Sequence, residues 1–278
     1  MKKSEVDEIS SFRKKYLGEF VEDKFKKYIR KNPDSVLVAQ DESGKSNIIG
    51  YAFSYLWGPD TGIIHHVLAT SESKEKIEHE LLRSIHEFFR QSELIKVYAW
   101  AKDEQTSLIK KLYAMDYNLE CEMLVFENNM QKSDFVTVED GLDIEIREFE
   151  KKYLDDVIKI EAKCFKPSWH QKKEDFLKQA NKPLSLFSVA VSQEKAVGYL
   201  QITAFDNLGY LGRVAVSPGY QGNGIGTKFT LKAMKWFEKN NVKNVRLRSP
   251  LADLPAHNLY RKFGFSEIGT EYEFVKRF

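Results

Sequence analysis

Hydrophobic residues are spaced in two ways along the second half of the chain, and the two spacings alternate. Apolar residues at every second position are typical of strands, and spacings of three and four are typical of helices. Strands are predicted in this way at residues 142–149, 185–192, 196–205, 208–216, 242–249 and 265–275. Helices are predicted at residues 153–165, 225–240 and 256–263. This order indicates an α/β fold (α+β mixed sheet), with an antiparallel meander in the middle and a crossover at the end.

The first half repeats this order with a shift along the sequence that is constant apart from a slip of one residue between Gly50 and Ile77, where Gly62 is best placed against Gly209. The shift carries Gly50 onto Gly198 and Phe89 onto Phe237, and it persists through a helix, a strand and a second helix, which is typical of a duplicated unit. Strands are expected at residues 35–40, 47–56, 62–69, 94–101 and 119–127, and helices within residues 4–31 and at 74–90. We therefore predict two tandem domains, residues 1–130 and 142–278, joined by a polar linker at residues 131–141.

Composition and charge narrow the class of protein. Lys and Arg number 43 against 41 Asp and Glu, so the net charge of +2 gives no reason to expect a nucleic-acid partner. The start lacks the apolar stretch of a signal peptide, and no apolar run approaches about 18 residues. We expect a soluble cytoplasmic protein with no membrane partner; its oligomeric state is left open. Cys121 and Cys164 show no metal-ligand spacing, which suits a reducing compartment and no metal site. His65 and His66 are adjacent in a predicted strand, so their rings are expected on opposite faces of the sheet.

A glycine-rich turn separates a predicted strand from a long amphipathic helix. The strand must end at Pro218, and Gly222, Gly224 and Gly226 follow at alternate positions. Glycines here leave backbone amides uncovered at a helix N-terminus, where the helix dipole favours anions, so the turn is a candidate phosphate cradle. The spacing matches neither the dinucleotide fingerprint nor the P-loop, which also requires Gly-Lys-Ser/Thr.

Two motifs together resemble the GCN5-related N-acetyltransferase (GNAT) family in its tandem-domain form. The first is Q-x-x-G-x-G, formed by Gln221, Gly224 and Gly226. The second is ADLPAHNLYRKFGF, residues 252–265, which departs from the family pattern at Asp253, where the family has asparagine. The resemblance implies two tandem GNAT-like acyl-CoA N-acyltransferase domains and acetyl-CoA (coenzyme A) as cofactor.

The resemblance also implies roles for particular residues of the second domain. The backbone of Val214, Ala215 and Val216 would pair with the pantetheine arm of the cofactor. The pyrophosphate would lie on the turn, which consists of Gln221, Gly222, Asn223, Gly224, Ile225, Gly226 and Thr227. Arg261 or Lys262 would meet the ribose phosphate. Tyr260 would give a proton to the departing thiolate, because a tyrosine of pKa about 10 is protonated at neutral pH. The alternative for Tyr260 is a core aromatic.

The acceptor side is less well defined by the sequence. Phe165, Trp169 and Asp206 are candidates for the acceptor site, and the alternative for the two aromatics is packing of helices on the sheet. His170 is a more distant candidate for proton relay. Many relatives carry a glutamate on the strand before the phosphate turn, whereas this chain has Gly212 and Arg213. Asp206 or Glu273 remain candidates for base through water. Without a strong base, an amine of low pKa, such as an α-amine, is favoured as acceptor.

The first domain lacks the cofactor motif. The same shift places Ser73, Lys76 and Glu78 where the second domain has Gln221, Gly224 and Gly226, and Tyr260 falls on Leu112. A carboxylate about 4 Å from a phosphate charge repels it by about 4 kcal/mol, which weakens binding about a thousandfold. We therefore predict one working acetyl-CoA-dependent N-acetyltransferase site, in which a primary amine attacks the thioester directly in a ternary complex. The alternative is a coenzyme-A-binding regulatory or scaffold protein without turnover.

Overall fold

The computed structural model describes residues 3–17, 26, 29–30, 32–41, 48–57, 59–70, 72–130, 144–205 and 207–278. The expected linker at residues 131–141 lies outside these residues. The chain divides by its internal contacts into two compact units. The first unit contains Met1–Met123 and Gly269–Phe278, and the second contains Leu124–Ile268.

The second unit is built on a mixed sheet. Its strands are β6 (Glu145–Glu148), β7 (Ser185–Ser192), β8 (Lys195–Phe205), β9 (Leu208–Val216) and β10 (Asn244–Pro250). Neighbours from β6 to β9 are antiparallel, and β10 pairs with β9 in parallel. The predicted meander and final crossover are therefore confirmed. A parallel neighbour requires a crossover connection, which helix α7 (Ile225–Lys239) provides.

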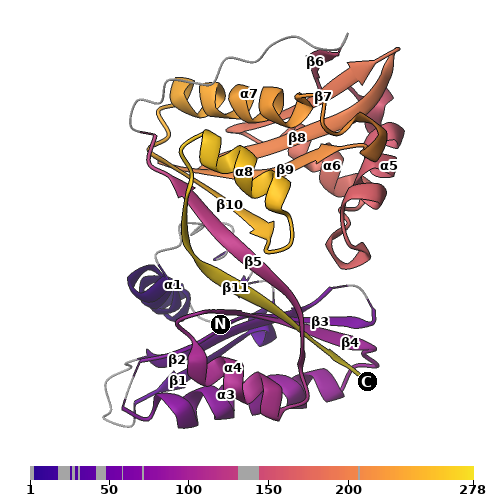
Figure 1. Cartoon of the computed structure of the whole chain (residues 1–278). Helices are drawn as coiled ribbons and strands as arrows, with labels where there is room; N and C mark the ends of the chain where they lie inside the picture. The colour runs from indigo at the N-terminus through magenta and orange to yellow at the C-terminus, as the bar shows by residue number, and fades with distance from the viewer. Residues whose placement is uncertain are drawn as a thin grey trace. The chain divides into compact units, whose positions relative to one another are not determined.

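Helices cover both faces of this sheet (Figure 1). On one face lie α7 and α8 (Leu254–Lys262), and on the other lie α5 (Leu154–Cys164) and α6 (Lys173–Ala180). Successive residues of β8 alternate between the two apolar cores, as the period of a strand requires: Leu200 belongs to the core under α7, and Tyr199 to the core under α5. The sequence analysis assigned no range to helix α6.

The first unit repeats this plan. Its strands are β1 (Val36–Gln40), β2 (Ile48–Leu56), β3 (Thr61–Ala69) and β4 (Lys96–Lys102). The helices α3 (Lys74–Arg90) and α4 (Thr106–Ala114) pack on one face of the sheet, and α1 (Lys3–Leu17) packs on the other. The bounds of α3 are those predicted from the sequence.

Equivalent glycines lie beneath the long helix of each unit. A Cβ at Gly62 would lie 3.0 Å from the ring of Phe89, and a Cβ at Gly209 would lie 2.5 Å from the ring of Phe237. The shift that relates the two halves of the sequence also relates Phe89 to Phe237. Each glycine thus makes room for the same aromatic ring of its helix, so the repeat is present in the packing as well as in the sequence.

Two strands carry the chain from one unit to the other. The first six residues of β5 (Asn118–Asn128) belong to the first unit, and the rest of the strand, from Leu124, belongs to the second. Strand β11 (Ser266–Arg277) begins in the second unit, and from Gly269 it belongs to the first, where it pairs with β4. Phe126 therefore lies in the core of the second unit and Phe274 in the core of the first. The sequence analysis placed each strand wholly with its own half of the chain.

One local expectation was wrong. The rings of His65 and His66 are 4.2 Å apart between centroids instead of lying on opposite faces. The register of β2 and β3 shifts between Phe53 and Ser54, where His65 is the extra residue of a β-bulge. A bulge interrupts the alternation of side chains along a strand.

Candidate functional site

The glycine turn follows directly from the end of β9. A short 3-10 helix, η4 (Pro218–Tyr220), turns the chain after Val216, and α7 begins at Ile225. The side-chain Nε2 of Gln221 donates a hydrogen bond of 2.9 Å to the carbonyl of Val216. Gln221 therefore fixes the turn to the end of the strand, and this contact brings two parts of the predicted cofactor site together.

Glycine is required at two positions of this turn. The φ angles of Gly222 and Gly224 are +80° and +74°, which other residues rarely adopt. A Cβ at Gly222 would meet no atom within 4 Å, so the backbone is uncovered on that side. A Cβ at Gly226 would lie 3.3 Å from Cδ2 of Leu259, so α8 lies against the start of α7.

The start of α7 suits an anion. The first four amides of a helix have no partner within the helix, and Gly224, at the N-cap, offers no side chain to satisfy them. The first turn of α7 contains no acidic residue. The side-chain amide of Asn223 points back into the turn, where it donates to the carbonyls of Tyr220 and Gln221, both at 3.2 Å. The residues present therefore fit a diphosphate, with backbone amides as donors and no carboxylate in the first turn of α7.

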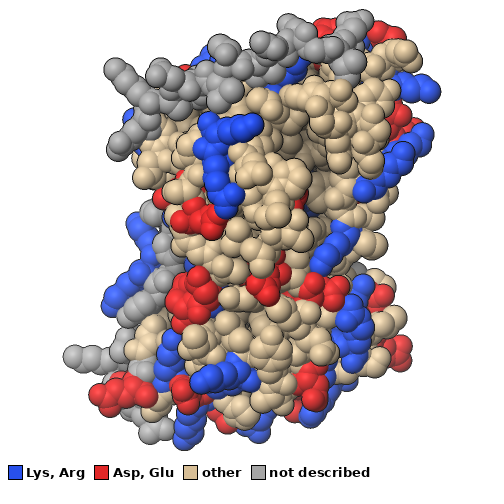
Figure 2. Space-filling view, viewed as in Figure 1, with Lys and Arg blue, Asp and Glu red and all other residues tan. Residues whose placement is uncertain are grey.

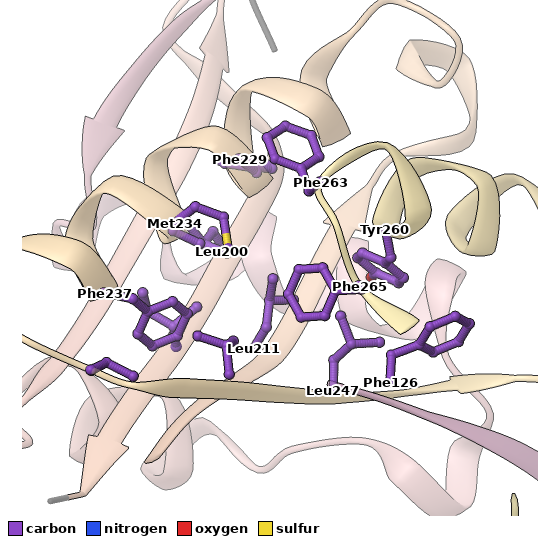
Figure 3. Packing of buried hydrophobic residues seen from close by; sticks show 14 of the residues in the cluster. Phe126, Leu200, Leu211, Phe229, Met234, Phe237, Leu247, Tyr260, Phe263 and Phe265 are labelled. Atoms are coloured by element: carbon purple, nitrogen blue, oxygen red, sulfur yellow. The ribbon is translucent and has the colours of Figure 1, made fainter. Parts of the chain in front are cut away.

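Tyr260 lies on α8, directly after Leu259, the residue that lies against the start of α7. Its ring packs against those of Phe126 and Phe265, with centroids 6.1 and 5.9 Å away (Figure 3). Its side chain is 7% exposed. Burial, followed by the negative charge of Asp253, raises the pKa of Tyr260. The hydroxyl thus stays protonated at neutral pH, as a proton donor requires, and the ring is at the same time a core aromatic.

The departure from the family pattern at Asp253 has a structural explanation. Its carboxylate accepts a hydrogen bond of 3.2 Å from the backbone N–H of Ala256, as the N-cap of α8. Aspartate and asparagine serve about equally well as N-caps, so the substitution preserves the start of this helix.

The two basic candidates lie at the end of α8. The guanidinium of Arg261 is paired with the carboxylate of Glu267 and lies 5.9 Å from the ring centroid of Phe126. Lys262 is exposed. The charge of Arg261 is thus already balanced within the protein, which makes Lys262 the simpler of the two candidates for a phosphate.

The acceptor candidates Phe165 and Trp169 lie between α5 and α6. The ring of Phe165 is 4.4 Å from the guanidinium carbon of Arg213, and the carbonyl of Trp169 accepts a hydrogen bond of 2.9 Å from Nη2 of the same arginine. Nε2 of His170 lies 2.9 Å from the carbonyl of Phe165 and can only donate to it. Asp206 lies outside the described residues. Glu273 is buried in β11, opposite Trp100, within the part of the strand that belongs to the first unit.

The sequence analysis missed the buried carboxylate on this side of the sheet. Glu161 of α5 is 2% exposed, and its Oε1 lies 3.7 Å from Nε of Arg213. The hydroxyl of Tyr199 donates to its Oε2. The signal was present in the sequence: Glu161 lies on the apolar face of its helix, with Val157, Ile160 and Cys164, and a charge in that place requires a partner.

The equivalent place in the first unit is closed by an ion pair. Glu78 lies on the first turns of α3, where the second unit has Gly226, and it is fully buried. Its Oε2 is 3.2 Å from Nζ of Lys111 and accepts a hydrogen bond of 2.8 Å from the hydroxyl of Ser107. Lys111 is the residue that the repeat relates to Leu259. The contact between glycine and leucine in the second unit is thus a contact between two charges in the first.

Neither metal ligands nor a spanning helix are found in the part of the chain that the structure describes. Within it, no group of three or more His, Cys, Asp and Glu side chains could hold a metal ion. The helices within the same residues are too short or too polar to cross a membrane. Figure 2 shows acidic and basic side chains interspersed on the visible face of the first unit, and mainly uncharged side chains on that of the second.

Comparison with known proteins finds similar sequences and similar structures. Residues 154–265 match the acetyltransferase (GNAT) family. An N-alpha-acetyltransferase of Sulfurisphaera tokodaii is 29% identical over 150 residues, which cover 49% of this chain and 87% of that protein. A GCN5-related N-acetyltransferase of Sphaerobacter thermophilus has a similar structure, with a TM-score of 0.72 and 14% identity over 91% of this chain and 85% of that one. A tandem GNAT protein from the clavulanic acid biosynthesis pathway has a TM-score of 0.67 and 13% identity over 87% of this chain and 83% of that one. The chain therefore has the fold of tandem GNAT proteins, and residues 154–265, within its second unit, match the GNAT acetyltransferase family.

Proposed function

We propose that this protein is an acetyl-CoA-dependent N-acetyltransferase with one working site, in the second unit. The uncovered backbone at Gly222, together with the uncapped start of α7, carries this proposal. Helix N-termini and glycine-lined turns are favourable sites for phosphate groups. The turn Gln221–Thr227 would hold the pyrophosphate of the cofactor, and the backbone of Val214, Ala215 and Val216 would pair with its pantetheine arm.

The cofactor, when bound, supplies a thioester whose carbonyl carbon accepts the amine nitrogen. In the transfer a carbon–nitrogen bond forms, the carbon–sulfur bond breaks, and the amine loses one proton while the thiolate gains one. Tyr260 would supply the proton of the thiolate, because a tyrosine hydroxyl is protonated at neutral pH; the raised pKa of this residue makes it a weaker acid. A backbone N–H of Ala215 or Val216 would stabilise the negative charge that develops on the carbonyl oxygen.

The acceptor we propose is a primary amine of low pKa, such as the α-amine of a peptide. Deprotonation at pH 7 costs about 4.6 kcal/mol for a lysine of pKa about 10.4, and about 1.4 kcal/mol for an α-amine of pKa about 8. The position on β9 where a base was sought holds Arg213, which cannot accept a proton. The name of the Sulfurisphaera relative, an N-alpha-acetyltransferase, agrees with this class of acceptor.

The first unit would bind no cofactor. The buried pair of Glu78 and Lys111 occupies the helix start, and a diphosphate there would lie beside a carboxylate. We propose that this unit serves the second one structurally, since part of it, Gly269–Phe278, follows the catalytic half in the sequence.

Calorimetry with coenzyme A tests the binding site. We expect one site per chain, and two sites would contradict the assignment of the first unit. Thr227→Glu places a carboxylate at the start of α7 without altering a glycine, and the helix dipole tolerates it; the affinity should fall about a thousandfold. His79→Glu adds the same charge at the exposed position of the first unit that the repeat relates to Thr227, and it should leave binding unchanged. Unaltered binding by Thr227→Glu would exclude the turn as the phosphate site.

Turnover tests the chemistry. Tyr260→Phe keeps the ring between Phe126 and Phe265 but removes the proton donor. The turnover number should fall about a hundredfold, as for loss of a general acid, with the affinity for coenzyme A almost unchanged. A peptide with a free N-terminus should react faster than a blocked peptide that contains lysine. Full activity of Tyr260→Phe would remove this residue from the mechanism, and a faster lysine reaction would contradict the acceptor class.

A further inference from the structure

A buried ion pair joins α5 to β9 in the second unit. Glu161 is 2% exposed and uses both carboxylate oxygens: Oε1 accepts a hydrogen bond of 2.9 Å from the backbone N–H of Gln171, and Oε2 accepts the hydroxyl of Tyr199. Nε of Arg213 lies 3.7 Å from Oε1. A buried carboxylate is stable only when its charge and its lone pairs are satisfied, and here one cation and two donors satisfy them.

The same arginine contacts the segment Phe165–Gln171, which connects α5 to α6. Its Nη2 donates a hydrogen bond of 2.9 Å to the carbonyl of Trp169, and its guanidinium lies 4.4 Å from the ring centroid of Phe165. Three of the seven residues of this segment are therefore held in place. Arg213 contacts Phe165 and Trp169, and Glu161 contacts Gln171. A planar guanidinium can make these contacts at once, because its donors point in fixed, different directions.

This arrangement ties the segment to the strand that we propose for the cofactor. Arg213 directly precedes Val214, the first of the three proposed cofactor-binding residues of β9. The thiol of Cys164 lies 3.3 Å from the carbonyl of Val216 and adds a second contact at the end of that strand. The half-buried rings of Phe165 and Trp169 thus lie at a fixed place beside β9.

Neither member of the pair is suited to exchange protons with a substrate. The carboxylate of Glu161 is buried and has both oxygens engaged, and the guanidinium of Arg213 stays protonated. Tyr199 is fully buried, and burial together with the charge of Glu161 raises its pKa. What this cluster can do is hold backbone and rings in position.

We propose that Arg213, fixed by Glu161, is a positioning residue that holds Phe165–Gln171 as one wall of the amine-binding site. The pair then sets the affinity for the acceptor without touching the reacting atoms. This inference rests on the proposed acetyl transfer in one respect, namely that the amine binds beside β9.

Steady-state kinetics with acetyl-CoA and a peptide α-amine test it. Arg213→Gln should raise the KM for the amine at least tenfold, with less than a twofold change in the KM for acetyl-CoA. Arg213→Lys keeps the positive charge but replaces the planar guanidinium with a single ammonium group, which cannot make all of these contacts at once. Its KM for the amine should therefore lie between those of the wild type and Arg213→Gln. Arg246→Gln is the matched control, because it removes an ion pair of 2.6 Å with Glu127 elsewhere in the same unit; both constants should stay unchanged.

Hydrogen exchange of the peptide that spans residues 165–171 gives a readout that does not depend on activity. Exchange should accelerate in Arg213→Gln and in Glu161→Gln but not in Arg246→Gln. Accelerated exchange in a protein that acetylates no amine would refute the proposed function and leave the positioning role intact. Should Arg213→Gln fail to fold, Arg213→Lys decides. The proposal is overturned if exchange of the segment stays at the wild-type rate, or if the two KM values rise together.

Discussion

The two units share one fold but differ where their long helices begin. In the second unit, Gly226 faces Leu259, and no side chain caps the start of α7. In the first unit, the repeat places Glu78 and Lys111 at these positions, where they form a buried ion pair. The same two helices are thus joined by an apolar contact in one unit and by opposite charges in the other. The difference indicates that a shared backbone does not by itself preserve a helix start without side-chain caps, which in the second unit depends on a few glycines.

The units also differ within their cores. In the first, Nδ1 of His86 lies 2.7 Å from the carbonyl of Leu82, and the hydroxyl of Tyr117 lies 2.9 Å from its Nε2. The repeat relates these two side chains to Met234 and Phe265, which belong to the apolar core of the second unit. The first unit therefore has polar groups at the start of its long helix and in the core beneath that helix, at positions where the second unit has apolar residues.

The largest effects on stability are expected from substitutions in β5 and β11, the two strands that pass from one unit to the other. Phe126→Ala should destabilise the second unit by about 3–5 kcal/mol, and Phe274→Ala should destabilise the first by a similar amount, because each ring is fully buried in that core. Hydrogen exchange of the full chain locates the loss: Phe126→Ala should expose amides of α7 and β10, and Phe274→Ala those of α3 and β4. The reverse distribution would show that each strand belongs to its own half of the chain.

The ion pair of the first unit should come next. Glu78→Gln leaves Lys111 without its carboxylate, and the free energy of unfolding should fall by about 3 kcal/mol, since a mostly buried cation then lacks compensation. Replacing both residues by leucine imitates the apolar contact of the second unit and should restore most of this loss. Urea denaturation measures both variants. If the double leucine variant is as unstable as Glu78→Gln, the ion pair contributes stability that an apolar contact cannot replace.

Most of the fold was predictable because its strands are buried on alternate faces. The strands β7, β8 and β9 lie within one residue of their predicted bounds, and turns with polar residues separate them clearly. The glycine turn was predictable for a different reason: three glycines at the start of a helix are costly unless the backbone needs them, and Gly222 and Gly224 do have positive φ angles.

Other features depend on information that one sequence segment does not contain. The strands β5 and β11 are equivalent in the repeat, with Phe126 matching Phe274, so their patterns alone do not tell which core each ring enters. The bulge at His65 depends on the register with β2. The pair of Glu161 and Arg213 joins a helix to a strand 52 residues away, and each charge alone looked like an isolated exception in an apolar pattern.

The smallest effect we predict is a pH dependence confined to the first unit. Burial, followed by the nearby charges of Lys276 and Arg90, lowers the pKa of His86 in the folded protein despite its backbone hydrogen bond. The folded state therefore binds fewer protons than the unfolded state, whose histidine has a pKa of about 6.5. The contribution of His86 to the free energy of unfolding is complete above the pKa of about 6.5 that it has in the unfolded state. This contribution declines as the pH falls from that value to the lowered pKa of the folded state.

Urea denaturation between pH 7.5 and 5.5 checks this expectation, with the variant His86→Met/Tyr117→Phe as the comparison. This variant installs the residues that the second unit has at the equivalent positions, Met234 and Phe265, and keeps every other histidine. Its free energy of unfolding should decline less with falling pH than that of the wild type, because the neutral ring that must gain a proton is absent. Equal slopes would mean that His86 is not responsible, and that the acid sensitivity comes from other titratable groups.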